Sequence, residues 1–184
     1  KYLAQEIYKI GILDIETTSL TADFGRMISW AILVRDVETG KETIRKGCVK
    51  EQDHKNANGR ADRIDKRITK ELIEAISDID YLVGHWFIGK HRHDMPFIRS
   101  RCAINKVSGF PKHKMVRYGD TQKFSSQLHR LRNNGLGTIA DAYNLAIQKT
   151  PVTTRDWKDA AQFANKKALR YILHHNILDV KITS

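Results

Sequence analysis

The carboxylates Asp14 and Glu16 are the residues whose type and spacing point most directly to chemistry. They stand two residues apart at the end of an apolar run, Ile12-Leu13-Asp14-Ile15-Glu16. Because successive side chains of a strand point to opposite faces, both acids share one face while Leu13 and Ile15 pack behind them. Two neighbouring carboxylates repel each other unless they share a proton or bind a cation. An isolated pair more often faces solvent, so a metal site requires further acids elsewhere in the chain.

Asp94 is the first such acid. It follows a loop rich in aromatic and basic residues and opens a helix in which Pro96 occupies the first turn, where a missing N–H costs nothing. Asp is also a good helix N-cap, so a structural role is the alternative. A zinc site is suggested by three histidines: His85, His91 and His93. Structural zinc sites usually include cysteine and a fixed ligand pair, which this loop lacks.

Asp179 is the second such acid. Residues spaced three and four apart predict one face of a C-terminal helix: Ala168, Tyr171, Ile172, His175, Leu178, Asp179 and Ile182. A carboxylate on an apolar face is costly to bury unless a charge or a metal compensates it. His175 lies one turn before Asp179, about 40° around the helix, so both can face one site. A structural histidine that hydrogen-bonds Asp179 is the alternative.

Composition indicates a polyanionic partner, most often nucleic acid. Lys and Arg number 32 against 21 Asp and Glu, which gives a formal net charge of +11. The 184 residues suffice for a single domain, residues 1–184, with its own core. A basic run suited to tracking a strand comprises Lys112, Lys114, Arg117, Lys123, Arg130 and Arg132.

The cysteines and the hydropathy bear on location. Cys48 and Cys102 stand far apart, with no metal-ligand spacing and no secretory leader, so we expect a reducing, intracellular (cytoplasmic) compartment. No apolar stretch approaches the ~20 residues of a membrane span, so no membrane association is expected. The chain begins at Lys1 without Met, and we expect it to be trimmed from a longer protein.

The alternation of period-two and period-3.6 patterns predicts an α/β domain. A turn at 38–41 joins the second and third strands, and the polar stretch 51–61 is predicted as a loop. Ile64, Ile68, Leu72 and Ile76 recur at helical spacing. The predicted strands cover residues 7–14, 27–35, a third segment ending near 49, 80–84 and 116–119. Three strands followed by helix and strand predict a mixed sheet.

Three segments in order resemble the motifs of the DEDD 3′→5′ exonucleases, members of the ribonuclease H-like superfamily that include polymerase proofreading domains. They are Asp14-Ile15-Glu16-Thr17-Thr18-Ser19-Leu20, Asp94-Met95-Pro96-Phe97-Ile98 and Asn176-Ile177-Leu178-Asp179-Val180. The resemblance covers nearly the whole chain. It implies a single exonuclease domain with a ribonuclease H-like mixed five-stranded sheet, flanked by helices on both faces.

The resemblance also implies the chemistry. Asp14, Glu16, Asp94 and Asp179 would hold two divalent cations, Mg²⁺ or Mn²⁺, which activate a water and stabilise the leaving 3′ oxygen. The substrate would be single-stranded nucleic acid with a free 3′ end, and the product a nucleoside 5′-monophosphate. The enzyme could work within a larger replication, repair or RNA-processing assembly.

Two histidines are candidates for the general base. His174 has the spacing of the family's histidine branch, whereas His175 stands where the other branch has tyrosine. The histidine branch places its His in a loop, but the helical periodicity here runs back to about Ala168, which favours His175. Either imidazole can take a proton near neutral pH.

The resemblance further implies substrate contacts. The backbone of Thr17 and Thr18 and the side chain of Leu20 would hold the terminal nucleotide. The loop His85-Trp86-Phe87 is also assigned to nucleic-acid binding, because stacking of a base on an aromatic ring is worth ~1–3 kcal/mol. Packing of Trp86 and Phe87 in the core is the stronger alternative. Two other functions stay open: a nucleic-acid-binding domain with a degraded site, and a structure-selective endonuclease.

Overall fold

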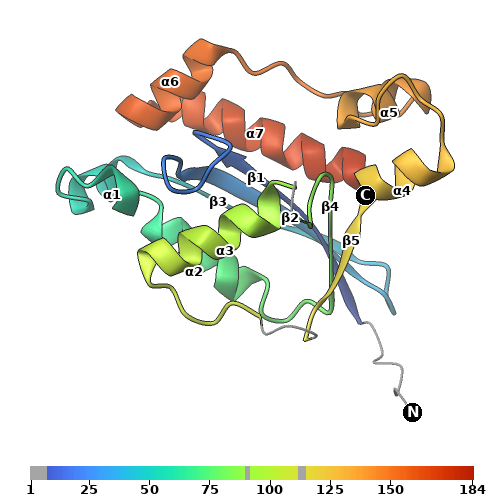
Figure 1. Ribbon diagram of the computed structural model, residues 1–184, viewed down its shortest axis with the longest axis horizontal. Coiled ribbons are helices and arrows are strands. Elements are labelled where there is room, and N and C mark those ends of the chain that lie inside the picture. The colour runs from blue at the N-terminus through green and yellow to red at the C-terminus, as the bar shows by residue number, and fades with distance from the viewer. Residues whose placement is uncertain (1–7, 90–91, 112–114) are drawn as a thin grey trace.

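A five-stranded mixed sheet in the order β3-β2-β1-β4-β5 forms the centre of the computed structural model, which describes residues 8–89, 92–111 and 115–184 (Figure 1). The pairs β1–β2 and β2–β3 are antiparallel, whereas β1–β4 and β4–β5 are parallel. The strands are β1 (Lys9–Thr17), β2 (Met27–Asp36), β3 (Glu42–Cys48), β4 (Tyr81–Gly84) and β5 (Arg117–Asp120). The predicted α/β class and the mixed five-stranded sheet are therefore confirmed.

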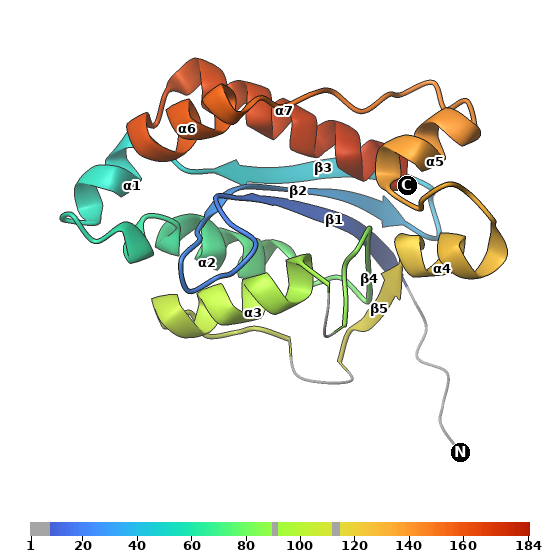
Figure 2. The ribbon, with the colours of Figure 1, turned by 45° about the horizontal axis from the view of Figure 1, so that its top comes forward.

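Helices cover the sheet on both faces. Figure 2 shows α6 and α7 on one side and α2 and α3 on the other. The helices are α1 (Glu51–Asn56), α2 (Lys66–Ala75), α3 (Asp94–Asn105), α4 (Thr121–Leu128), α5 (Leu136–Ala142), α6 (Thr154–Phe163) and α7 (Lys166–Thr183), with a 3₁₀ turn at Ala61–Arg63. Among the described residues, no helix has the length and apolarity needed to cross a bilayer.

The short helix α1 corrects one prediction, because its residues were expected to form a loop. The side chain of Asp53 accepts a hydrogen bond from the Lys50 backbone N–H at 2.7 Å, and the Asp53 backbone N–H donates to the Lys50 carbonyl oxygen at 2.9 Å. Asp53 also binds the Arg67 guanidinium at 2.8 and 2.7 Å. A contact with α2 therefore stabilises a helix whose own residues carry no apolar periodicity.

The alternation along β1 directs its two acids toward α7. Leu13 and Ile15 belong to the main core beneath the sheet, whereas Ile12 packs with Val180 of α7. Asp14 and Glu16 share the face of Ile12, as their spacing predicted. The strand continues to Thr17, with a register shift between Glu16 and Thr17. Glu16 is thus held by its pairing with Ser29 of β2, directly before the point where the register shifts.

A buried ion pair fixes α3, the helix that begins with Asp94. Arg101 donates from Nε and Nη2 to the carboxylate of Asp65 at 2.8 and 2.6 Å. The same carboxylate accepts from the Met27 backbone N–H at 2.8 Å and from the Asn105 amide at 2.9 Å. Asp65 therefore joins α3 to β2 and to the start of α2, and this network sets the position of the helix that carries Asp94.

Candidate metal centre and active site

Three of the predicted site residues meet at the face of α7. Glu16, His175 and Asp179 each offer a ligand atom, and these atoms lie within 4.8 Å of one another. His175 Nε2 is 3.5 Å from Glu16 Oε1 and 3.7 Å from Asp179 Oδ2. His175 and Asp179 are buried one turn apart, as the helical spacing predicted. The cluster joins one strand to one helix.

Asn176 ties Asp14 to the same helix. Its side-chain amide donates a hydrogen bond to Asp14 Oδ2, and its oxygen accepts from Ser29 Oγ at 3.3 Å. Asn176 is completely buried and Asp14 is half-buried, so the bond is partly shielded from water. The sequence interpretation gave Asn176 no role, although a buried amide beside His175 on an apolar helix face is a signal that needed explaining.

Asp94 lies buried at the first position of α3, but it is not the helix cap. The N-cap is His93, and no side-chain capping hydrogen bond is formed there. Asp94 is 4 % exposed, and its Oδ2 accepts no hydrogen bond from any residue that the structure describes. The N-cap alternative therefore does not account for Asp94.

The electrostatics show that the four acids share one environment. Burial, followed by the charge of Asp179, raises the pKa of Asp14 to about 7. Burial, followed by the charges of Asp14 and Asp179, raises the pKa of Glu16 to about 9. Burial, followed by the charges of Asp14 and Glu16, raises the pKa of Asp94 well above its ordinary value. The ionised carboxylates of Asp14, Glu16 and Asp94 are thus destabilised by burial and by the neighbouring negative charges.

These residues fit divalent cations. Two buried carboxylate oxygens, Asp94 Oδ2 and Asp179 Oδ1, lack a hydrogen-bond partner among the described residues. Hard cations such as Mg²⁺ and Mn²⁺ prefer carboxylate oxygens, and a bound cation would offset the repulsion that raises the pKa values of the acids.

The segment that follows α5 supplies two contacts that the sequence interpretation missed. Lys149 Nζ lies 2.6 Å from Asp179 Oδ2, and Thr150 Oγ1 lies 2.7 Å from His175 Nδ1. The Tyr171 hydroxyl donates to the Pro151 carbonyl oxygen at 2.5 Å, which holds the segment against α7. Since this stretch has no regular period, no pattern in the sequence signals its place beside the acids.

Substitution of Lys149 by methionine should destabilise the metal-free protein and tighten its binding of metal. Lys149 partly neutralises the acids, so its loss leaves Asp179 without that cation, whereas a metal no longer has to displace the ammonium group. We expect a lower melting temperature in chelator and a larger rise on adding Mg²⁺ than in wild type. Lys41→Met, at the exposed β2–β3 turn, is the control. Equal Mg²⁺ responses in both variants would exclude competition between Lys149 and metal.

The raised pKa values predict how stability depends on pH. Asp14 and Glu16 have ordinary pKa values of 3.8 and 4.5, and in the folded protein these become about 7 and about 9. The metal-free folded state therefore retains protons that the unfolded chain releases, so its free energy of unfolding should fall as the pH rises from about 4 to about 9.

Metal should reverse that loss. Mg²⁺ at a hundredfold excess over its Kd adds about 2.7 kcal/mol, which corresponds to roughly 5–10 °C in melting temperature for a domain of this size. The rise should be larger at pH 8 than at pH 5, because protons compete with the cation at the lower pH. Thermal melts at both pH values, with Mg²⁺ and with chelator, provide the measurement. A rise that is the same at both pH values would contradict this expectation.

The expected contacts to the terminal nucleotide lie beside this site. Thr17 and Thr18 line a cleft of about 330 Å³, and Glu16 and His175 line another of about 510 Å³. Trp157 lines both clefts, so they adjoin, and the sequence interpretation gave it no role in the site. Leu20 is 83 % exposed in the loop after β1.

The three residues of the loop before α3 that were assigned to nucleic-acid binding differ in their exposure. Phe87 is fully buried in the main core, as the core-packing alternative predicted, and this leaves no ring face for a base. Trp86 is half exposed, with the Arg92 guanidinium 5.8 Å from its ring centroid. His85 is half-buried, and its Nδ1 lies 3.0 Å from Thr121 Oγ1.

Asp120 holds this loop in place. It is the N-cap of α4, and its carboxylate also accepts hydrogen bonds from the backbone N–H groups of Phe87 and Ile88 at 2.8 and 3.2 Å. Its charge also contributes to the raised pKa of Asp94, so Asp120 influences the site both through the backbone before α3 and through electrostatic repulsion.

Other residues named from the sequence fall outside the site or outside the described residues. His174 is exposed on α7 and turns away from the buried cluster. In the basic run, Lys112 and Lys114 lie outside the described residues, as does His91 of the zinc alternative. The other four basic residues are exposed: Arg117, Lys123, Arg130 and Arg132.

Comparison with known proteins provides no assignment. No family model matches the chain, and no curated protein matches its sequence. The choice among functions therefore depends on the geometry and charge of the acid cluster.

Proposed function

We propose that this protein is a metal-dependent 3′→5′ exonuclease with a ribonuclease H-like fold, which hydrolyses nucleic-acid phosphodiester bonds to nucleoside 5′-monophosphates. The supporting observation is the set of acids on β1, α3 and α7: burial and neighbouring negative charges raise the pKa values of Asp14, Glu16 and Asp94. Two buried carboxylate oxygens in this set have no hydrogen-bond partner among the described residues. The net charge of +11 supports a polyanionic substrate.

Asp14, Glu16, Asp94 and Asp179 are the residues that would hold the cations, Mg²⁺ or Mn²⁺. When bound, two such cations would polarise the scissile phosphate, favour ionisation of a water and neutralise the leaving 3′ oxygen. The protein's contribution is to keep the four carboxylates at fixed positions. Strand pairing holds Glu16, the Asn176 amide holds Asp14, and the Asp65–Arg101 network holds the helix of Asp94.

His175 is the general base in this proposal. Burial lowers its pKa, so the imidazole is neutral and able to accept a proton. Its Nδ1 lies 2.7 Å from Thr150 Oγ1, and a bond from the Nδ1 proton to that oxygen leaves Nε2 free. Nε2 points toward Glu16 and Asp179, so the proton of the attacking water would pass to this atom.

Replacement of His175 by glutamine should lower the rate by about 10²-fold or more, the usual contribution of a general base. His174→Gln should leave the rate close to that of wild type, because the His174 side chain is exposed and is not part of the buried cluster. Single-turnover rates at saturating Mn²⁺ and over a range of pH provide the measurement. A greater loss in the His174 variant would move the base to that residue.

The proposed function is tested with end-labelled single-stranded DNA and RNA, in Mn²⁺ and in chelator. We expect a ladder that shortens from the 3′ end in Mn²⁺ alone, and no shortening when the 3′ end carries a blocking group. Internal cleavage of the blocked substrate would indicate an endonuclease. Binding without cleavage of any substrate would indicate a nucleic-acid-binding domain with a degraded site.

A further inference from the structure

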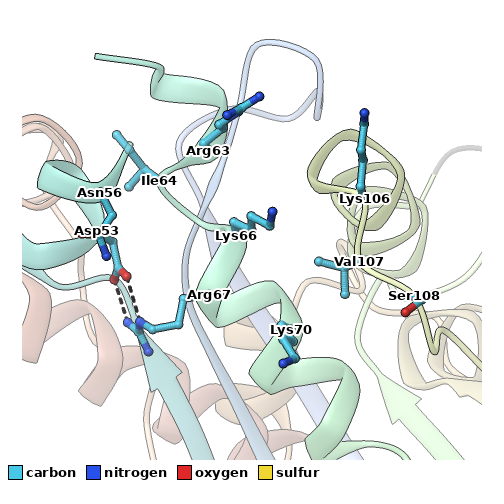
Figure 3. A pocket seen from close by; sticks show the side chains of 10 residues that line it. All are labelled: Asp53, Asn56, Arg63, Ile64, Lys66, Arg67, Lys70, Lys106, Val107 and Ser108. Atoms are coloured by element: carbon cyan, nitrogen blue, oxygen red, sulfur yellow. Dashed lines mark hydrogen bonds and ion pairs between the residues drawn. The ribbon is translucent and has the colours of Figure 1, made fainter. Parts of the chain in front are cut away.

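A second pocket lies far from the acid cluster. It has a volume of about 510 Å³ and is bordered by the end of α1, by α2 and by the segment that follows α3 (Figure 3). The 12 residues of α3 separate Asp94 from Lys106 at the pocket rim by about 18 Å of helix. The pocket also lies with α2 and α3, on the side of the sheet opposite α7 (Figure 2). It therefore cannot be an extension of the candidate active site.

The pocket contains unneutralised positive charge. Arg67 is paired with Asp53 and with Glu71, so its charge is already satisfied. Arg63, Lys66 and Lys106 have no acidic group within 4.0 Å among the residues that the structure describes. Figure 3 shows Arg67 turned toward Asp53, while Lys66 lies near the centre, with Arg63 above it and Lys106 to its upper right.

Lys70 adds a fourth cation to this lining. Its nearest carboxylate is that of Glu74 at 3.7 Å, and both side chains are largely exposed, so that pair is weak. Four cations around one concavity repel one another and favour the entry of an anion.

Lys106 has a backbone conformation that glycine would adopt more easily. It is the C-cap of α3 in the left-handed region, at φ 54° and ψ 43°. The turn is fixed by hydrogen bonds from the N–H groups of Lys106 and Val107 to the carbonyl oxygens of Ala103 and Cys102. A helix end of this kind usually carries glycine, because other residues are strained there. The lysine at the pocket rim therefore occupies a strained backbone position. Strained residues often occur at binding sites.

We propose that this pocket binds the phosphate groups of a nucleotide or of a nucleic-acid strand. Lys and Arg, with the Ser108 hydroxyl and the Asn56 amide on the same lining, are the donors that phosphate oxygens accept from. A volume of about 510 Å³ lies within the range of small-molecule sites and exceeds the needs of one carboxylate. The inference is independent of the proposed function, since binding here requires neither metal nor cleavage.

The test is calorimetric titration of the whole chain with inorganic tripolyphosphate in the presence of chelator, so that no metal can carry the anion to the acid cluster. Wild type should bind one equivalent. Lys66→Gln and Lys106→Gly should each weaken binding about tenfold, the value of one charge-assisted hydrogen bond. Lys41→Gln, with the same loss of charge at the β2–β3 turn, should bind like wild type.

Lys106→Gly separates binding from folding. It removes the positive charge and relieves the backbone strain, so its melting temperature should equal or exceed that of wild type while its affinity falls. A nucleoside triphosphate and a short single-stranded oligonucleotide are titrated in the same way. The probe that binds more tightly identifies the source of the phosphates. Absence of saturable binding for all three probes would overturn the proposal. Affinities in the Lys66 and Lys106 variants equal to that of Lys41→Gln would overturn it as well.

Discussion

Replacement of Asp94 by asparagine should reduce the proposed metal-dependent nuclease activity about a thousandfold and also raise the thermal stability of the metal-free protein. The loss of activity follows because a cation supplies several kcal/mol of transition-state stabilisation, and each 1.4 kcal/mol is about tenfold in rate. The gain in stability follows because Asp94 is buried among like charges, with one oxygen unpaired. Asparagine keeps the size of the side chain and removes its charge.

Both effects can be measured in one set of proteins. Rates are compared in Mn²⁺, and melting temperatures in chelator at pH 8, where the acids repel one another more strongly than at pH 5. Asp141→Asn is the matched control, because Asp141 is an exposed residue of α5, and both quantities should stay unchanged. Full activity in Asp94→Asn would remove Asp94 from the metal site. A lower melting temperature would show that its carboxylate is stabilised in the folded protein.

Replacement of Arg101 by methionine should lower the free energy of unfolding by about 3–5 kcal/mol, the usual cost of removing one partner of a buried ion pair. Arg101 and Asp65 are 1 % and 0 % exposed, so Asp65 would be left with a buried charge and only neutral donors. Arg101 also donates to the carbonyl oxygens of Ala22 and Asp62, at 2.9 and 2.5 Å, and both would lose this donor. Since a domain is stable by only about 5–15 kcal/mol, the loss is a large fraction of the total.

Urea unfolding followed by circular dichroism measures this loss. Arg99→Met is the control, because Arg99 is an exposed residue of the same helix whose guanidinium only stacks on the Phe110 ring. Its replacement should cost about 0.5–1 kcal/mol. Asp65→Asn added to Arg101→Met should recover part of the stability, because it removes the buried charge. A loss below about 1 kcal/mol in Arg101→Met would mean that water reaches the pair.

Several features could be predicted from the sequence because they depend on local periodicity. The spacing of Asp14 and Glu16 was enough to place both on one face of a strand, and the structure has them on the face toward α7. The helical repeat placed His175 and Asp179 on one face of a helix, and the structure has these two side chains next to each other. The alternation of strand and helix patterns predicted the mixed five-stranded sheet. In each case the information lies within a few neighbouring residues.

Other features depend on contacts between residues far apart in the chain. Phe87 was a candidate for base stacking beside the stronger alternative of core packing, and the structure has its ring in the core. Its backbone N–H is bound by Asp120, 33 residues later. Lys149 reaches Asp179 from an irregular segment that no pattern marks.

The sequence by itself determined which side chains share a strand face or a helix face, since backbone geometry repeats every two or 3.6 residues. The tertiary structure alone decided which faces meet. It placed Asp94 of α3 among the acids of β1 and α7, and Lys66 of α2 in one pocket with Lys106 beyond α3. The physical reason is that such meetings arise from the packing of whole elements and from buried pairs such as Asp65–Arg101, whose partners lie 36 residues apart and have no common period.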